Sequence, residues 1–255
     1  MTDLFDRNLR ALRRDRAARQ GPELFLFNRA FDDCLERLAD IPRRFERALM
    51  IGCPSRAWPE RVRAIAADVD VLEPGPLFAG MAGGAPVEED RHDFGEERYD
   101  LCIAVGTLDT VDDLPLALQL IRRAMRADSP MVGALAGGNS LPTLRSSLIE
   151  AGRAVGRVVA RSHPRIDASS LAGLLSSAGF VMPVVDVDRV AIRYSSFDAL
   201  VRDLRLMGAT SILANRAPMI RRPELEAARS SFAASADAGR SSETVEILHF
   251  LGWTQ

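Results

Sequence analysis

An apolar run that ends in a glycine is the first feature of the sequence that could support chemistry. The stretch Arg47–Ala57 reads RALMIGCPSRA, and Glu73 follows its glycine by about 20 residues. This spacing is typical of a unit in which a strand, a cofactor-contacting turn and a helix lead to a second strand whose terminal acid binds a ribose hydroxyl. We therefore expect Gly52 to lie in such a turn and Glu73 to end the second strand.

The basic side chains narrow the possible chemistry. All residues in the Lys+Arg count of 33 are arginine. The absence of lysine excludes lysine Schiff-base chemistry and a P-loop lysine. Cys34, Cys53 and Cys102 lie far apart and match no metal-ligand spacing, so we expect no metal site and interpret them as free thiols in a reducing cytoplasm.

The overall composition is that of a soluble globular protein. With 255 residues and 47% hydrophobic content, the chain can form one large domain or a domain with an inserted lobe. A formal net charge of -2 gives no indication of a nucleic-acid or membrane-surface partner. No apolar run approaches the roughly 18 residues that a membrane helix needs, and a signal-peptide segment is not evident. We expect a cytoplasmic protein.

The elements that must position these residues alternate between strands and helices. This order predicts a mostly parallel sheet covered on both faces, with ligands beyond the carboxyl ends of its strands. We expect residues 74–86 to be irregular, and 182–194 to be one long strand or a pair of short ones. The other expected strands are 48–51, 69–72, 100–105, 131–135 and 244–251. The expected helices are 1–20, 23–40, 114–127, 140–157, 169–178 and 197–207, with a weak one at 224–232. A further helix after Gly52 should carry Val62 and Ile65.

The first 40 residues form a helical arm in this interpretation. Leu4, Phe5, Leu9 and Leu12 are spaced as one apolar stripe, with arginines on the remaining faces. The arm is either a solvated helix that packs on the body through this stripe, or a lid or partner-binding element. A second helical excursion, residues 195–240, precedes the last strand; we treat both as parts of a single domain, 1–255.

Several stretches carry a family resemblance. The chain resembles the class I, seven-stranded S-adenosylmethionine (SAM)-dependent methyltransferases, and within them the bacterial and mitochondrial branch of the respiratory complex I assembly factor. More distantly it is similar to the malonyl-carrier-protein methyltransferase of biotin synthesis. The matching stretches are FDRNLR at 5–10, IPRRF at 41–45, DDLPLAL at 112–118, GALAGGNSLPTLRSSL at 133–148, DLRLMGATS at 203–211 and GW at 252–253.

The resemblance implies an α/β, Rossmann-like fold and a SAM site. The family has an acid and three alternating glycines at the first turn, where this chain has Met50, Gly52, Pro54 and Arg56. Proline and arginine add bulk at positions where only glycine lets the backbone approach a ligand. SAM binding is therefore either retained, or else weakened or lost. The residues that the resemblance assigns to the cofactor are Gly52, Cys53, Glu73, Glu88 or Glu89 near the adenine, and Val105.

Other positions correspond to the acceptor side of the family fold. Asn139, Ser140 and Arg145 follow the fifth strand, and His163 precedes a proline in a family-like stretch. We expect these residues to line a substrate cleft, although a satisfied surface histidine and a solvated arginine are the ordinary alternatives. The family's aromatic pair after the fourth strand is replaced here by Asp109 and Thr110.

The resemblance leaves three functions open, and no catalytic residue is assigned. In the first, the chain modifies or chaperones a protein partner such as a respiratory complex I subunit; the mitochondrial relative is assigned as an arginine hydroxylase despite its methyltransferase fold. In the second, the chain is a non-catalytic binding or assembly module with a degenerate cofactor site. In the third, it is a small-molecule methyltransferase of the biotin-synthesis type.

Overall fold

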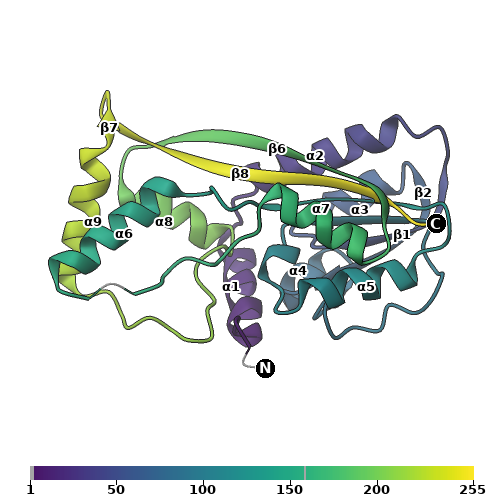
Figure 1. Cartoon of the computed structure of the whole chain (residues 1–255), viewed down its shortest axis with the longest axis horizontal. Helices are drawn as coiled ribbons and strands as arrows, with labels where there is room; N and C mark the ends of the chain where they lie inside the picture. Colours follow the sequence, from purple (N-terminus) through teal and green to yellow (C-terminus); the bar gives the residue numbers. More distant parts are fainter. Residues whose placement is uncertain (1–2, 158) are drawn as a thin grey trace.

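The computed structural model describes residues 3–157 and 159–255, so the first two positions of the predicted arm lie outside the described residues. Within these ranges the sheet has eight strands, in the order β3-β2-β1-β4-β5-β8-β6, with β7 paired to β8 (Figure 1). The first five strands are parallel, whereas β8 is antiparallel to β5 and β6. The strands are β1 Phe45–Ile51, β2 Ala66–Glu73, β3 Ala85–Pro86, β4 Leu101–Val105, β5 Pro130–Ala136, β6 Val181–Tyr194, β7 Ala236–Asp237 and β8 Arg240–Trp253.

The predicted α/β class with a mostly parallel sheet is confirmed. The helices are α1 Arg7–Gln20, α2 Phe25–Ala39, α3 Ala57–Val62, α4 Pro76–Met81, α5 Leu114–Ala124, α6 Pro142–Ala154, α7 Ala168–Ser177, α8 Phe197–Leu206 and α9 Arg222–Ala234, with a 3-10 turn, η1, at Leu108–Thr110.

The core lies on both faces of the sheet because neighbouring strand residues point to opposite sides. In β1, Leu49 joins the cluster under α5 and α7, whereas Met50 joins the cluster under α2 and α3. Both side chains are almost fully buried. Burial of each contributes roughly 1.5–3 kcal/mol, so the sheet is firmly held at the strand ends where a ligand would bind.

Several predicted boundaries differ from the structure. Residues 74–86 are not irregular, because Pro76 begins α4 and β3 follows it; a proline is well placed in a first helical turn, where its missing N–H is not needed. The helix after Gly52 ends at Val62 and excludes Ile65. The 182–194 segment is one long strand with an irregularity between Val181 and Val184.

The arm helix α1 presents a different face to the body from the one expected. Leu12 is 60% exposed, whereas Arg10 and Arg14 are only 7% and 5% exposed. Phe5 does pack inward, against Ile212, so the predicted stripe is correct only in part. The prediction was wrong for the arginines because they pair with buried acids that are far away in sequence, Arg10 with Glu89 and Arg14 with Glu73.

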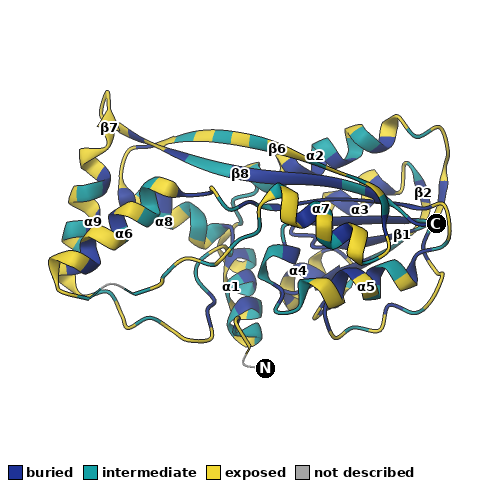
Figure 2. Cartoon of the chain, viewed as in Figure 1, coloured by how far each residue is buried: buried dark blue, intermediate teal, exposed yellow. Residues whose placement is uncertain are grey.

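A third hydrophobic cluster lies away from the parallel strands. Helices α6, α8 and α9 pack there around residues such as Phe197 and Phe232. Strands β6 and β8 extend from the main sheet to this cluster as a long two-stranded ribbon (Figure 1). In Figure 2, β8 is buried over most of its length, while β6 alternates between intermediate and exposed residues.

Candidate cofactor site and the N-terminal arm

Glu73 lies at the end of β2, as predicted, with no exposed surface. Its carboxylate accepts hydrogen bonds from Nε and Nη2 of Arg14, the latter at 2.8 Å. It also accepts the backbone N–H of Cys53 at 2.7 Å and that of Gly75 at 2.8 Å. A carboxylate offers about four acceptor positions, so those of Glu73 are filled by the chain itself.

A second arginine of α1 forms a similar pair with Glu89. Arg10 donates to both carboxylate oxygens at 2.7 and 2.8 Å, and to the carbonyl of Thr107 at 2.7 Å. Burial alone would lower the pKa of Arg10, but the neighbouring Glu89 carboxylate raises it above its ordinary value. Of the two acids expected near an adenine, Glu89 is therefore the buried one, whereas the Glu88 side chain is 50% exposed.

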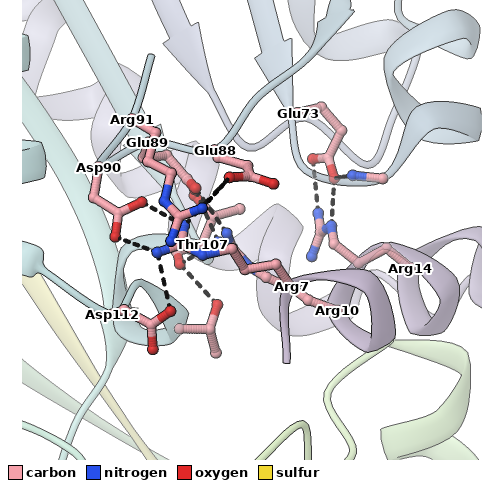
Figure 3. Close-up of polar contacts among 12 residues, drawn as sticks. Arg7, Arg10, Arg14, Glu73, Glu88, Glu89, Asp90, Arg91, Thr107 and Asp112 are labelled. Atoms are coloured by element: carbon pink, nitrogen blue, oxygen red, sulfur yellow. Dashed lines mark hydrogen bonds and ion pairs between the residues drawn. The ribbon is translucent and has the colours of Figure 1, made fainter. Parts of the chain in front are cut away.

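Arg7 is the third arginine of α1 that pairs with acids of the rest of the domain. Its guanidinium donates to the two oxygens of Asp90 at 2.5 and 2.7 Å and lies 3.0 Å from Oδ2 of Asp112. Because Arg7, Arg10 and Arg14 are three and four residues apart, they share one face of α1. Figure 3 shows the Arg14 side chain pointing from α1 toward Glu73, and those of Arg7 and Arg10 pointing toward the Glu88–Asp90 segment and Asp112. Three arginines thus bind the arm to the rest of the domain, Arg14 at the end of β2 and Arg7 and Arg10 at the loops beside it.

Gly52, Cys53 and Val105 lie together at the turn after β1. Gly52 has φ +78°, and a Cβ there would lie 2.3 Å from the carbonyl oxygen of Val105. The fold itself therefore requires this glycine, whether or not a ligand binds. Burial raises the pKa of the Cys53 thiol to about 12, and its Sγ contacts the carbonyl of Ser55 at 3.2 Å.

The residues predicted for a substrate cleft are only partly brought together. Ser140 and His163 line a cavity beside the carboxyl ends of β4 and β5. Asn139 and Arg145 are not on its lining: Nδ2 of Asn139 donates to Glu246 at 3.3 Å, and Nη1 of Arg145 donates to the carbonyl of Gly138 at 3.2 Å.

His163 is half-buried and joins three parts of the chain. Its Nε2 accepts the backbone N–H of Ile212 at 2.9 Å, and its ring lies edge-on to Phe5 with centroids 5.3 Å apart. Burial lowers its pKa, which the charge of Asp109 opposes and that of Arg165 reinforces. The imidazole is therefore a neutral acceptor at this position. Sequence reasoning missed Arg10, Arg14 and Arg165, although the regular spacing of Arg7, Arg10 and Arg14 was a usable signal.

Two further observations concern the described residues only. Residues 3–157 and 159–255 contain no group of three or more His, Cys, Asp or Glu side chains that could hold a metal ion. No helix in these ranges is long and apolar enough to cross a membrane.

The residues at the end of β2 do not fit a bound SAM nucleoside as they stand. A ribose hydroxyl would need a free acceptor on Glu73, and Arg14 uses that capacity. The turn also carries Pro54 and Arg56 in place of glycines. The arm must leave Glu73 before this acid can contact a ribose.

Comparison with solved structures defines the class. The chain is similar to the YcgJ protein of Bacillus subtilis, with a TM-score of 0.60 and 11% identity over 88% of this chain and 98% of that one. It is also similar to phosphoethanolamine N-methyltransferase 2 of Haemonchus contortus in complex with S-adenosylhomocysteine, with a TM-score of 0.51 and 8% identity over 88% of this chain and 52% of that one. The fold is that of the class I SAM-dependent methyltransferases.

Sequence relatives define the family. The chain is 31% identical to the mitochondrial arginine-hydroxylase NDUFAF5 of Rattus norvegicus, over 98% of this chain and 77% of the relative. It belongs to the NDUFAF5 family. Malonyl-[acyl-carrier protein] O-methyltransferase 1 of Coxiella burnetii is 27% identical over 48% of this chain and 41% of that protein. No family model matches the sequence.

Proposed function

We propose that this chain is a protein-binding member of the NDUFAF5 family that works without SAM. The observation that carries the proposal is the pairing of Glu73 with Arg14 of the same chain. The acid that would hold the ribose instead holds the N-terminal arm against the sheet. The methyltransferase fold then serves as a scaffold for binding a partner, with α1 as a structural part of it.

The energetics of the pair support this proposal. Removing one partner of a buried ion pair typically costs 3–5 kcal/mol, because the other charge remains buried. A ribose hydroxyl that donates to Glu73 returns roughly 1.5–3 kcal/mol. The second pair, Arg10 with Glu89, adds to the cost if the whole helix must move. For the Glu73 pair alone the net cost is up to about 3.5 kcal/mol, which weakens SAM by up to roughly 300-fold relative to an open site.

We propose a protein as the partner, and specifically a subunit of respiratory complex I. The resemblance to complex I assembly factors favours this choice, and the relation to NDUFAF5 extends over 98% of the chain. The small-molecule alternative is less well supported, since the malonyl-carrier-protein methyltransferase relation covers 48% of it. A cytoplasmic location accompanies the proposal, because Cys34, Cys53 and Cys102 are free thiols of the kind that a reducing compartment maintains.

The test is calorimetric titration with S-adenosylhomocysteine. The wild-type protein is expected to show no binding with a Kd below about 1 mM. Binding should appear when Arg14→Met is combined with Pro54→Gly and Arg56→Gly, which free Glu73 and restore the glycines. Arg19→Met, at an exposed position of the same helix, is the matched control and should behave as the wild type. Binding of S-adenosylhomocysteine to the wild-type protein at micromolar concentration would refute the proposal and favour an enzymatic function instead.

The partner is tested separately by cross-linking in cells of the source organism. A complex I subunit or assembly intermediate should be captured by the wild-type protein and by the Arg19→Met control. Capture of soluble metabolic enzymes alone, with no respiratory subunit, would contradict the choice of partner while leaving the titration result intact.

A further inference from the structure

A mostly apolar cavity of about 130 Å³ lies between the arm and the carboxyl ends of β4 and β5. Its walls come from α2, from the end of α8 with the loop that follows, and from β8. Apolar side chains such as Leu26, Phe27, Leu204, Met207 and Ile247 form much of the lining. A cavity near 150 Å³ is large enough to hold benzene, so this one has room for a short hydrocarbon stem.

Some polar groups on the cavity lining have no hydrogen-bond partner. Within the described residues, Nε of Arg10, Nε of Arg165 and Oγ1 of Thr210 are buried and have no hydrogen-bond partner. Buried donors are almost always paired, so unpaired donors on the cavity lining indicate a missing acceptor. Arg10 is already tied to Glu89 through its other nitrogens, whereas Arg165 forms no ion pair with any described residue.

Arg165 is thus the cation available to a ligand. Its neighbours do not neutralise it: Asp109 also lines the cavity but lies beyond ion-pair distance, and Arg145 adds a second positive charge nearby. His163 is neutral and its Nε2 is occupied by Ile212. An anionic oxygen would satisfy Arg165, and the apolar walls would cover whatever is attached to it.

We propose that this cavity binds a short-chain monocarboxylic acid, whose carboxylate pairs with Arg165 and whose hydrocarbon stem lies against the apolar walls. A single carboxylate is favoured over a dicarboxylate because Asp109 repels a second negative charge, and because the other two arginines on the lining, Arg10 and Arg14, already pair with Glu89 and Glu73. The cavity shares Arg10 and Arg14 with the arm contact described above, but the inference rests on Arg165, which takes no part in the pairing of Glu73.

The test is a titration of the full chain with pentanoate, followed by calorimetry or ligand-observed NMR. Pentanoate should bind at least about tenfold more tightly than 1-pentanol, because a hydrogen bond to a charged group is worth about 1.5–3 kcal/mol. Arg165→Gln should weaken pentanoate by about the same factor and leave 1-pentanol unchanged. Arg153→Gln, an exposed arginine outside the cavity, is the matched control and should bind pentanoate as the wild type does.

A second variant keeps the test decisive if Arg165→Gln fails to fold. Asp109→Asn removes the repelling charge while preserving size, so pentanoate should bind about two- to tenfold more tightly. The proposal is overturned if pentanoate does not bind at about 10 mM, if it binds no better than 1-pentanol, or if Asp109→Asn leaves its affinity unchanged. In those cases ordered water satisfies the donors. The pentanoate titrations use the wild type and variants that keep Arg14, so their outcome is read separately from that of the S-adenosylhomocysteine titration.

Discussion

Replacement of Arg14 by methionine should reveal how strongly the arm is held. Arg14 is 5% exposed and Glu73 has no exposed surface, so the pair is shielded from water. The variant removes the two hydrogen bonds from the guanidinium but leaves those from the Cys53 and Gly75 N–H groups. Glu73 then keeps half of its donors. We therefore expect a loss near the lower end of the range for broken buried pairs, about 3 kcal/mol.

Aromatic contacts add a smaller contribution to this value. The Arg14 guanidinium lies 5.5 Å from the Phe78 ring centroid and 6.0 Å from that of Phe27. Cation–π contacts are worth about 0.5–1 kcal/mol at exposed sites and about 2 kcal/mol when desolvated. Methionine retains an apolar stem between the two rings, so the total expected loss is about 3–4 kcal/mol.

Urea unfolding of a double-mutant cycle measures this energy. Glu73→Gln alone and Arg14→Met alone should each destabilise the protein, and the double variant should cost about 2–3 kcal/mol less than the sum of the two. Arg19→Met is the control, because its side chain is 63% exposed and 3.8 Å from Asp15; it should change stability by less than about 0.5 kcal/mol. A loss below about 1 kcal/mol for Arg14→Met, or no coupling, would show that the arm is not held by this pair.

Two further predictions concern His163 and Gly52. Burial lowers the folded-state pKa of His163, so its neutral form stabilises the protein fully above about pH 6.5, and this contribution is lost as the pH falls toward the folded-state pKa. The urea unfolding midpoint should therefore fall less steeply between pH 7 and pH 5 in His163→Gln than in the wild type. An equal slope in the two proteins would contradict the assignment. Gly52→Ala should lower the free energy of unfolding by about 3 kcal/mol without any ligand, because Gly52 has a positive φ and its new Cβ would clash with Val105. Gly80→Ala, in open space within α4, should raise the free energy of unfolding by about 0.5–1 kcal/mol. Equal effects of the two substitutions in thermal unfolding would refute the steric argument.

The sheet could be predicted because its signals are local. The apolar run 48–51 before Gly52 and the run 101–105 both lie in strands, and all residues of these two runs are buried. Strand ends were less predictable: β8 begins at Arg240, several residues before the expected start, because pairing with β6 continues there in a segment of polar composition. Such pairing depends on a partner strand, which local composition does not report.

The sequence predicted where Glu73 lies in the fold but not which group it pairs with. The spacing between Gly52 and Glu73 correctly placed the acid at the end of a strand. Its occupation by Arg14, 59 residues earlier, could not be derived from helical periodicity, which assigns arginine to the solvent face. A charged side chain can be buried when an opposite charge pairs with it, whatever its hydropathy. Such pairs can be identified only when the fold is known, because their members are far apart in sequence.

The position of β8 has a consequence for how the protein is made. This strand lies between β5 and β6 in the sheet, yet it is synthesised after every other strand. Until β8 emerges from the ribosome, the 14 residues of β6 have no neighbour in the sheet, and the edge of β5 stays open. A nascent chain of this protein therefore carries unpaired strand edges, which are prone to aggregation, over the whole interval between β6 and β8. Its yield in cells should depend on chaperones that cover those edges during synthesis.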